Sequence, residues 1–384
     1  MDHRELKNRI YPHFARIAQA LASESRLELV DLLSQAPRDI ESLAGETGMP
    51  AEIVSLDIQM LLAANLVSSE QRGNIIVYEL AERSVASVWL ALRGLAEARL
   101  PEVRQLSAKI LPSRDNGQTV PRDRVSDILS EGAQLLDVRP ADEFAAGHLT
   151  DAVNIPIEEL PGRLSELPSN RRIITYCRGE YCMFSDEAAE VLRTNGFDVV
   201  RLQGGWLEWQ AEGRPTKTLR TILFTDLVDH AAMMSRLGDE RGRDVLRENE
   251  RVTREMLRAH SGTEVKTMGD GFMASFGSVS GAVECAVALQ KAFAARDADE
   301  RLDVRVGLNA GEPIEETGDL FGATVILASR IAAKAQGGEI LVADTVRGLC
   351  SGKGFLFCDR GDFVPKGFDE PLRVYEVKWR DGSS

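Results

Sequence analysis

The feature that most constrains the fold of this chain is a change in the spacing of its apolar residues. Up to about residue 110, apolar residues recur at the three- and four-residue spacing of amphipathic helices. Short apolar runs such as QLLDV and RRIITYC then alternate with helical stretches, as in buried parallel strands. Two polar segments, residues 112–121 and 213–218, separate these regions. The pattern predicts three domains, over residues 1–110, 118–215 and 217–384.

The totals restrict the class of protein. The chain has 384 residues, more than one core usually holds, and a net charge of −14 gives no overall attraction to nucleic acid or anionic membranes. It contains no apolar run of about 18 residues and no apolar N-terminal signal region. Its five cysteines are few and odd in number, which argues against a disulfide framework. We therefore expect a cytoplasmic protein with no membrane partner.

Local signals in the first domain predict short helices followed by a hairpin. Asp39 suits the N-cap of one helix, and Pro50 begins the next, over residues 50–64. The stretch LVSSEQRGNIIVYEL alternates about a Gly-Asn turn and predicts two paired strands. A long helix, SVASVWLALRGLAEAR, follows and could pair with its copy in a dimer. Three short helices before a hairpin indicate a winged helix-turn-helix.

The middle domain places a thiol at the end of a predicted buried strand. Cys177 ends that strand, and RGEYC would form a tight loop before a helix that begins near residues 184–186 and ends before Gly196. Backbone N–H groups at a helix N-terminus favour an anion, and together with Arg178 they should lower the pKa of the thiol. The alternative is an inert buried cysteine, the commoner fate of this residue.

The last domain places two carboxylates where strands end. Asp226 ends the strand ILFTDL, and Asp270 lies in a Met-Gly-Asp-Gly turn of a predicted hairpin. If these strands are neighbours, both carboxylates meet at one edge of the sheet. Such a pair suits Mg²⁺ or Mn²⁺, which complete their coordination with water and substrate phosphates. Alone, each aspartate would be an ordinary turn or cap residue.

The middle domain resembles the rhodanese (sulfurtransferase) family through LLDVRPADEFAAGHLTDAVNIPIEEL, YCRGEYC and LQGGWLEWQAEGRP. The resemblance implies that Cys177 accepts a sulfane sulfur from a donor as a persulfide, inside a loop formed by Arg178, Gly179, Glu180, Tyr181 and Cys182. Glu180 places a negative charge in a site meant for anions. Cys182 could resolve an oxidised or persulfidated Cys177 as a disulfide, or it could be an inert thiol.

The first domain resembles the ArsR type of winged helix through FARIAQALASESRLELVDLL, ESLAGETGMP and NLVSSEQRGNIIVYEL. The resemblance implies a dimer that binds operator DNA with helix 50–64 in the major groove. The candidate contacts are Ser55, Gln59 and Arg72. Residues 1–100 have 10 Lys/Arg and 14 Asp/Glu, a net charge of 10 − 14 = −4. We expect Glu52 and Asp57 to oppose phosphate binding, which leaves a dimerisation and signalling module as the alternative.

The last domain resembles the class III nucleotidyl cyclases through LFTDLV, EVKTMGDGFMASF, DVRVGLNAGEP, DLFGATVILASRI and PKGFDEPLRVYEV. The resemblance implies a head-to-tail homodimer whose site holds two Mg²⁺ or Mn²⁺ ions and converts ATP to cyclic AMP. The implied roles are metal binding by Asp226, Asp270 and the Leu227 backbone, adenine recognition by Lys266 and Asp319, stabilisation of α-phosphate charge by Arg330, and phosphate binding by Arg305 and Lys366.

Ile326 departs from this pattern. Many class III cyclases have an asparagine there that positions the ribose, and isoleucine cannot donate a hydrogen bond. The loss should cost about 2–4 kcal/mol of transition-state stabilisation, roughly 10²–10³ in rate. The other groups are present, so we favour a slow cyclase over a module that only binds nucleotide.

These expectations combine into a multidomain protein. It joins a winged-helix domain, an α/β domain with a parallel rhodanese-like sheet, and an α+β ferredoxin-like cyclase domain. The favoured function is an adenylate cyclase regulated by a sulfur- or redox-responsive module and a winged helix. The alternatives are a sulfur-responsive transcription regulator whose cyclase domain only binds nucleotide, and a sulfurtransferase.

Overall fold

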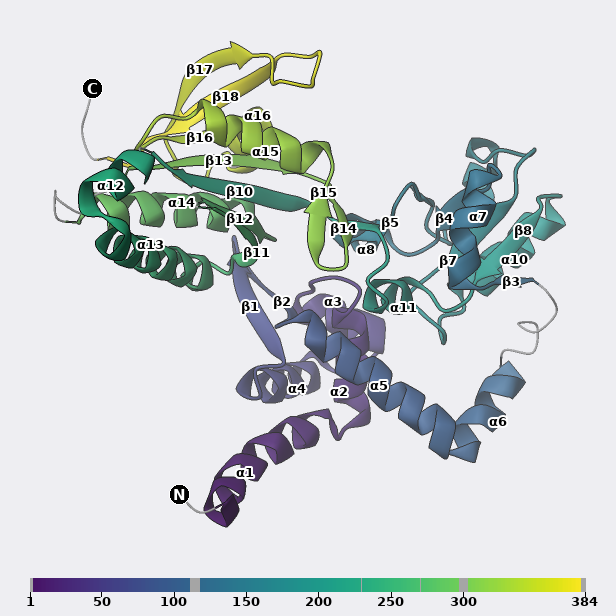
Figure 1. Cartoon of the computed structure of the whole chain (residues 1–384). Helices are drawn as coiled ribbons and strands as arrows, with labels where there is room; N and C mark the ends of the chain where they lie inside the picture. Colours follow the sequence, from purple (N-terminus) through teal and green to yellow (C-terminus); the bar gives the residue numbers. More distant parts are fainter. Residues whose placement is uncertain (1–2, 111–117, 229, 270, 297–302, 381–384) are drawn as a thin grey trace. The chain divides into compact units, whose positions relative to one another are not determined.

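The computed structural model describes residues 3–110, 118–228, 230–269, 271–296 and 303–380. The chain forms two compact units, Met1–Arg214 and Pro215–Ser384 (Figure 1). Within the described residues, no helix combines the length and the apolar character needed to cross a membrane.

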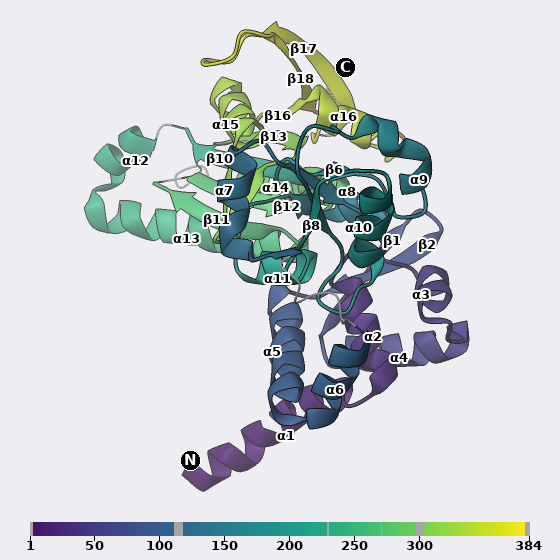
Figure 2. The same cartoon turned by 90° about the vertical axis from the view of Figure 1, so that its right-hand side faces the viewer.

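The first unit begins with helices and a hairpin, as the sequence predicts (Figures 1 and 2). The elements are α1 His3–Leu21, α2 Glu24–Leu33, α3 Ile40–Thr47, α4 Ala51–Ala63, β1 Val67–Arg72, β2 Ile75–Leu80, α5 Arg83–Arg99 and α6 Pro101–Ile110. The Asp39 carboxylate caps α3 by accepting the Ser42 N–H at 2.7 Å. Gly73 takes the turn between β1 and β2 with φ 62°. The predicted cap and hairpin are confirmed.

The remainder of this unit is built on a parallel sheet in the order β3-β8-β7-β4-β6. Its strands are β3 Thr119–Val120, β4 Gln134–Asp137, β6 Val153–Asn154, β7 Ile173–Tyr176 and β8 Val199–Leu202. The connecting helices are α7 Val125–Ser130, α8 Ala141–Ala146, α9 Leu160–Arg163, α10 Phe184–Thr194 and α11 Trp206–Ala211, with β5 His148–Leu149 after α8. Every residue of β7 is buried, which explains its continuous apolar run.

The second unit is a mixed sheet in the order β11-β12-β10-β13-β16-β18-β17. Its strands are β10 Arg220–Leu227, β11 Thr263–Met268, β12 Gly271–Phe276, β13 Val304–Gly311, β16 Ile340–Ala343, β17 Phe357–Phe363 and β18 Leu372–Val377. Its helices are α12 His230–Leu237, α13 Asp239–Ala259, α14 Val279–Ala294, α15 Ala323–Lys334 and α16 Asp344–Leu349. Helices α13 and α14 cover one face and α15 covers the other (Figure 1).

Helix α15 packs unusually close to the sheet. A Cβ on Gly307 of β13 would lie 2.1 Å from the backbone nitrogen of Ala332, so only glycine permits this approach. The small strands β9 Thr216–Lys217, β14 Ile314–Glu316 and β15 Asp319–Phe321 pair antiparallel just before α15. The close approach of the helix and this hairpin together determine where the polar groups of the unit lie.

Candidate functional site

Asp226 lies near the carboxyl end of β10 and is half-exposed. In the register of β10 and β13 it stands opposite Arg305, whose Nε donates to the Asp226 carboxylate at 2.8 Å. A second guanidinium nitrogen of Arg305 donates to the same oxygen. The predicted phosphate-binding arginine and the predicted metal-binding aspartate therefore form one ion pair, and a cation at Asp226 would have to compete with Arg305.

Strand β12 brings the predicted metal-binding turn to the same edge. Thr225 of β10 pairs with Phe272 of β12, so the turn between β11 and β12 adjoins the end of β10. The two predicted strands are thus neighbours, whereas Asp270 itself lies outside the described residues. The Leu227 side chain is buried in the core, which leaves its backbone as the group that could face a metal.

Carboxylate and carbonyl oxygens are the donors that Mg²⁺ and Mn²⁺ prefer, so Asp226 and the Leu227 carbonyl fit such an ion. Among the described residues, no group of three or more His, Cys, Asp and Glu side chains is arranged to hold a metal.

Lys266 and Asp319 come together from β11 and β15. The ammonium of Lys266 donates to both carboxylate oxygens of Asp319, at 2.8 and 2.7 Å. These hydrogen bonds from Lys266 hold the pKa of Asp319 below its usual value. Both side chains remain more than one-third exposed, and the ring of Phe321 lies 5.6 Å from the ammonium. Such an exposed ion pair contributes little to stability.

Arg330 and Ile326 lie one turn apart on α15, as their spacing predicts. Ile326 is 45% exposed. The Nε atom of Arg330 is buried and has no hydrogen-bond partner in the described part of the chain, which suits a group that awaits an anionic ligand. Lys366 is exposed in the turn between β17 and β18 and is not brought to the Asp226–Arg305 pair.

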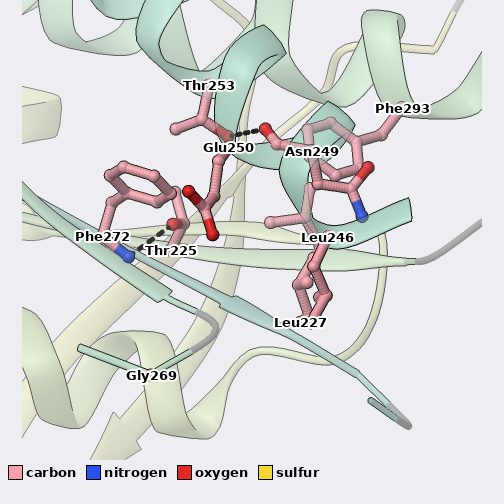
Figure 3. Close-up of a pocket in the computed structure, with 10 residues that line it drawn as sticks. Thr225, Leu227, Leu246, Asn249, Glu250, Thr253, Gly269, Phe272 and Phe293 are labelled. Carbon is pink, nitrogen blue, oxygen red and sulfur yellow. Dashed lines mark hydrogen bonds between the residues drawn. The ribbon is translucent and has the colours of Figure 1, made fainter. Parts of the chain in front are cut away.

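A small cavity lies behind the carboxyl end of β10, against α13 (Figure 3). Glu250 and Asn249 of α13 line it together with Thr225, whose hydroxyl accepts the Phe272 N–H at 3.0 Å. Its volume is about 20 Å³, enough for roughly one water-sized molecule. This cavity is therefore far too small for a nucleotide.

Cys177 follows β7 directly and is fully buried. Its Sγ lies 3.3 Å from the Ser185 hydroxyl and 3.5 Å from the Cys182 carbonyl oxygen. Burial raises the pKa of this thiol, but hydrogen bonds from Cys182, from Ser185 and from the loop backbone outweigh burial and lower it overall. The lowered pKa was predicted, although hydrogen bonds and not the adjacent Arg178 are its cause.

Arg178 points away from the sulfur because carboxylates hold it elsewhere. Its guanidinium donates to Glu143 of α8 at 2.9 Å and to Glu46 of α3 at 2.9 Å. Arg38, just before α3, also pairs with the buried Glu143. The loop after Cys177 is thereby joined to the helix-turn-helix.

Two further loop residues are linked to the long helix α5, Tyr181 directly and Glu180 through Glu208 of α11. The Tyr181 hydroxyl donates to Glu97 at 2.7 Å. The Glu180 N–H donates to Glu208 of α11 at 3.3 Å, and Arg93 of α5 pairs with the same carboxylate. Sequence reasoning missed these contacts. Their one signal was the pair of opposite charges at 93 and 97, one turn apart on α5.

One expectation about the helix-turn-helix was wrong. Asp57 does not face outward from α4, because its carboxylate is buried and accepts hydrogen bonds from Arg26 at 3.0 Å and Ser25 at 2.5 Å. A buried carboxylate requires such partners. Asp57 therefore stabilises the packing of α2 on α4 and does not repel a ligand.

The outward face of α4 is apolar. Gln59 is exposed, Ser55 is half-buried, and the Arg72 side chain lies outside the described residues. The exposed apolar side chains at helical spacing are Ile53, Leu56 and Met60. No lysine or arginine occurs between residues 39 and 71. This face lacks the charge that phosphate neutralisation requires.

Two family profiles match the chain. The profile "Rhodanese-like domain" matches residues 122–212, and "Adenylate and Guanylate cyclase catalytic domain" matches residues 215–378. These ranges contain the Cys177 loop and the polar groups of the second unit, respectively.

Curated relatives match the two halves separately. "HTH-type transcriptional regulator Rv0324" of Mycobacterium tuberculosis is 37% identical over 205 residues, 52% of this chain and 88% of that protein. "Putative adenylate cyclase 3" of Rhizobium meliloti is 34% identical over 172 residues, 43% of this chain and 29% of that protein. The chain thus spans most of the first relative and under a third of the second.

Among solved structures, the adenylyl cyclase CyaB from P. aeruginosa is 24% identical, with a TM-score of 0.39. The match covers 43% of this chain and 96% of that one.

Proposed function

We propose that this chain converts ATP to 3′,5′-cyclic AMP and pyrophosphate. Its N-terminal half belongs to the family of the helix-turn-helix regulator, and the chain carries a rhodanese-like domain and a class III nucleotidyl cyclase domain. The observation that carries the proposal is the pair formed by Lys266 and Asp319, at 2.7 and 2.8 Å. An ammonium beside a carboxylate offers one donor and one acceptor to a base edge.

Adenine fits this pair better than guanine. The adenine amino group can donate to Asp319 while its adjacent ring nitrogen accepts from Lys266. Guanine presents a carbonyl oxygen in place of that amino group, and the oxygen would face the Asp319 carboxylate. A site whose polar groups are left unpaired rejects the wrong ligand strongly, so the pair favours ATP over GTP.

Asp226, Asp270 and the Leu227 carbonyl would hold two Mg²⁺ or Mn²⁺ ions. Bound metals activate the ribose 3′ oxygen and neutralise the triphosphate. Arg330 supplies positive charge at the α-phosphate, where its unpartnered Nε offers a hydrogen bond. A cation at Asp226 would replace Arg305 as the partner of this carboxylate, and the guanidinium would then be available for the remaining phosphates. Lys366, which lies apart from this pair, is the second proposed phosphate ligand.

A homodimer is part of the proposal. The cavity at the end of β10 has a volume of only about 20 Å³, so the described part of one chain offers no enclosed nucleotide site there. Ile326 and Phe321 are exposed beside the polar groups, where a second copy could complete the walls. We infer that the metal-binding residues of one copy face the Lys266–Asp319 pair and Arg330 of the other.

The third part of the proposal is that the first unit regulates the cyclase. Tyr181 and Arg178, in the loop after Cys177, contact Glu97 of α5 and Glu46 of α3. A sulfur atom or oxidation at Cys177 would disturb these contacts, and α5 is the helix expected to pair with its copy. We propose that this change alters the geometry of the cyclase dimer. Equal cyclase activity with and without a persulfide donor, in wild type and in Cys177→Ser, would refute this regulation.

The central experiment is incubation of the full chain with Mg-ATP or Mn-ATP and measurement of cyclic AMP. We expect cyclic AMP from wild type, none from Asp270→Ala, and a smaller yield of cyclic GMP from GTP. Asp239→Ala, an exposed aspartate at the start of α13, is the matched control and should retain activity. Absence of product from wild type with either metal would contradict the proposal.

A transcription regulator is the second candidate, because the relative that covers the N-terminal half carries that name. The absence of lysine and arginine between residues 39 and 71 weighs against operator binding. A gel shift on the upstream DNA of its own gene at 50 and 200 mM salt decides the matter. Salt-dependent specific binding together with no cyclic AMP would favour this candidate.

A sulfurtransferase is the third candidate, and a 33% identical relative that this chain covers over 79% of its length is named "Sulfurtransferase". The acidic side chain of Glu180 in the loop weighs against thiosulfate as donor. Thiocyanate formation from thiosulfate and cyanide tests this activity directly.

A further inference from the structure

The loop that follows β7 contains two thiols that contact each other. Cys177 and Cys182 are both reduced, and Cys182 packs against the apolar cluster that contains Cys177. The Cys177 Sγ lies 3.5 Å from the Cys182 carbonyl oxygen, and both side chains belong to the same apolar cluster. Cys177 is fully buried, whereas Cys182 is half-buried and meets solvent. A short loop thus holds an inner and an outer sulfur together.

The surroundings give the two sulfurs different roles. Burial opposes ionisation of Cys177, but hydrogen bonds from Cys182, Ser185 and the loop backbone lower its pKa. The pKa of Cys182 is raised, mainly by its hydrogen bond with Cys177 and secondly by burial. Cys177 is therefore the nucleophile and Cys182 the proton-bearing partner.

We propose that this pair reduces the sulfane sulfur of a low-molecular-weight persulfide to sulfide and is itself oxidised to a Cys177–Cys182 disulfide. In the first step the Cys177 thiolate attacks the outer sulfur of R–S–SH. A bond forms between Cys177 Sγ and that sulfur, the S–S bond of the donor breaks, and RS⁻ leaves.

In the second step the Cys182 sulfur attacks the Cys177 Sγ. The disulfide bond forms, the bond to the outer sulfur breaks, and sulfide leaves with the proton of Cys182 as H₂S. The net reaction is R–S–SH plus two thiols to RSH, H₂S and one disulfide. The sulfane sulfur gains the two electrons that the cysteines lose, so no other oxidant is needed. A dithiol reductant resets the loop.

The charges near the loop select the donor. Glu208 is 8% exposed, accepts the Glu180 N–H at 3.3 Å, and places a buried carboxylate against the loop backbone. Glu180 adds a second acidic side chain. Because Arg93 pairs with Glu208, the acidic side chain that opposes an anion is Glu180, and it opposes thiosulfate, a dianion, more than a hydropersulfide that is neutral or carries a single charge. The acidic surroundings thus favour a persulfide over thiosulfate.

Residues of the winged helix keep the loop over Cys177. Tyr181 donates to Glu97 of α5 at 2.7 Å, and Arg178 donates to Glu46 of α3 at 2.9 Å. Since Cys177 has no exposed surface, a donor must wait until the loop opens. Loss of the Tyr181 hydrogen bond in Tyr181→Phe should therefore speed the reaction by about 2- to 10-fold, the equilibrium effect of one ordinary hydrogen bond.

The test uses the full chain, reduced with dithiothreitol, freed of the reductant, and mixed with cysteine hydropersulfide, which carries at most a single net negative charge, in the absence of nucleotide. Wild type should release close to one sulfide per chain, and mass spectrometry should show a Cys177–Cys182 peptide lighter by two hydrogen atoms. Cys182→Ser should keep a persulfide on Cys177 and release little sulfide in the first turnover. Cys177→Ser should do neither, and Cys358→Ser, at an exposed cysteine of β17, should behave as wild type.

Three results would overturn the proposal. One is a stable Cys177 persulfide in wild type, and another is a sulfide yield from Cys182→Ser equal to that of wild type. The third is no reaction in wild type or Tyr181→Phe while circular dichroism shows both folded. Because the assay contains no nucleotide, its outcome is separate from that of the cyclase assay.

Discussion

Replacing Ile326 with asparagine tests whether one missing contact limits the cyclase. Ile326 lies on α15 one turn before Arg330 and is 45% exposed. Isoleucine offers no hydrogen bond there, whereas the asparagine common in class III cyclases could position the ribose. The side chain is not part of the buried core, and the two residues have similar helix propensities. The substitution should change stability by no more than about 0.5 kcal/mol.

The gain in rate follows from the strength of a positioning contact. One hydrogen bond that strengthens in the transition state contributes about 2–4 kcal/mol, and each 1.36 kcal/mol corresponds to a tenfold change in rate. Ile326→Asn should therefore raise kcat about 10²- to 10³-fold with a smaller change in KM. A contact made equally to bound ATP would change mainly KM.

The assay measures initial rates of cyclic AMP formation over a range of Mn-ATP concentrations. Ile326→Val and Ile326→Ala are the matched controls, since neither adds a donor, and both should stay near the wild-type kcat. An asparagine variant that is folded and dimeric but no faster than the alanine variant would refute the reasoning. In that case the absence of a hydrogen-bond donor at residue 326 does not limit the rate of the wild-type cyclase.

Three other predictions follow from contacts in the structure. Asp319→Asn replaces the carboxylate paired with Lys266 by an amide that can also donate a hydrogen bond. The ratio of kcat/KM for ATP to kcat/KM for GTP should therefore fall at least about tenfold. An unchanged ratio would show that this pair does not recognise the base. Asp57→Asn leaves its half-buried partner Arg26 without a countercharge and should lower the free energy of unfolding of the winged helix by about 1–3 kcal/mol. A lower urea midpoint by circular dichroism would show this, with exposed Gln59→Ala as control. Ser185→Ala removes a hydrogen bond that lowers the pKa of Cys177, so the pKa of this thiol should rise. The midpoint of the pH profile of iodoacetamide alkylation should then move to higher pH, and the alkylation rate at pH 7 should fall. An unchanged midpoint would exclude the Ser185 hydrogen bond as a cause of the lowered pKa.

Local structure was largely predictable because its causes are local. Asp39 caps α3 since its carboxylate meets an N–H three residues later along the chain. The Gly-Asn turn joins β1 and β2 since glycine accepts the positive φ. Asp226 follows a run of buried β-branched and aromatic residues, which marked the end of a strand. Each of these signals needs only a few neighbouring residues.

Partners distant in sequence were not predictable. Asp57 was expected to face outward, yet a half-buried arginine 31 residues earlier in the chain holds it inward. Arg305 was expected to meet phosphate, yet in this structure it neutralises Asp226 across two strands. The contact of Tyr181 with Glu97 joins residues 84 positions apart. The sequence positions of charged residues do not indicate which opposite charge each will contact in the folded chain.

The sequence alone determined the order of the domains, the strand that ends at Cys177, and the chemical types of the groups in the second unit. Apolar spacing and strand-end residues suffice for these, because secondary structure follows from a few adjacent residues. The resemblance of the sequence to class III cyclases already paired Lys266 with Asp319. Only the tertiary structure decided that Arg305 meets Asp226 and that the Cys177 loop meets α3 and α5. Burial makes an unpaired charge costly, and packing alone determines which opposite charge is within reach.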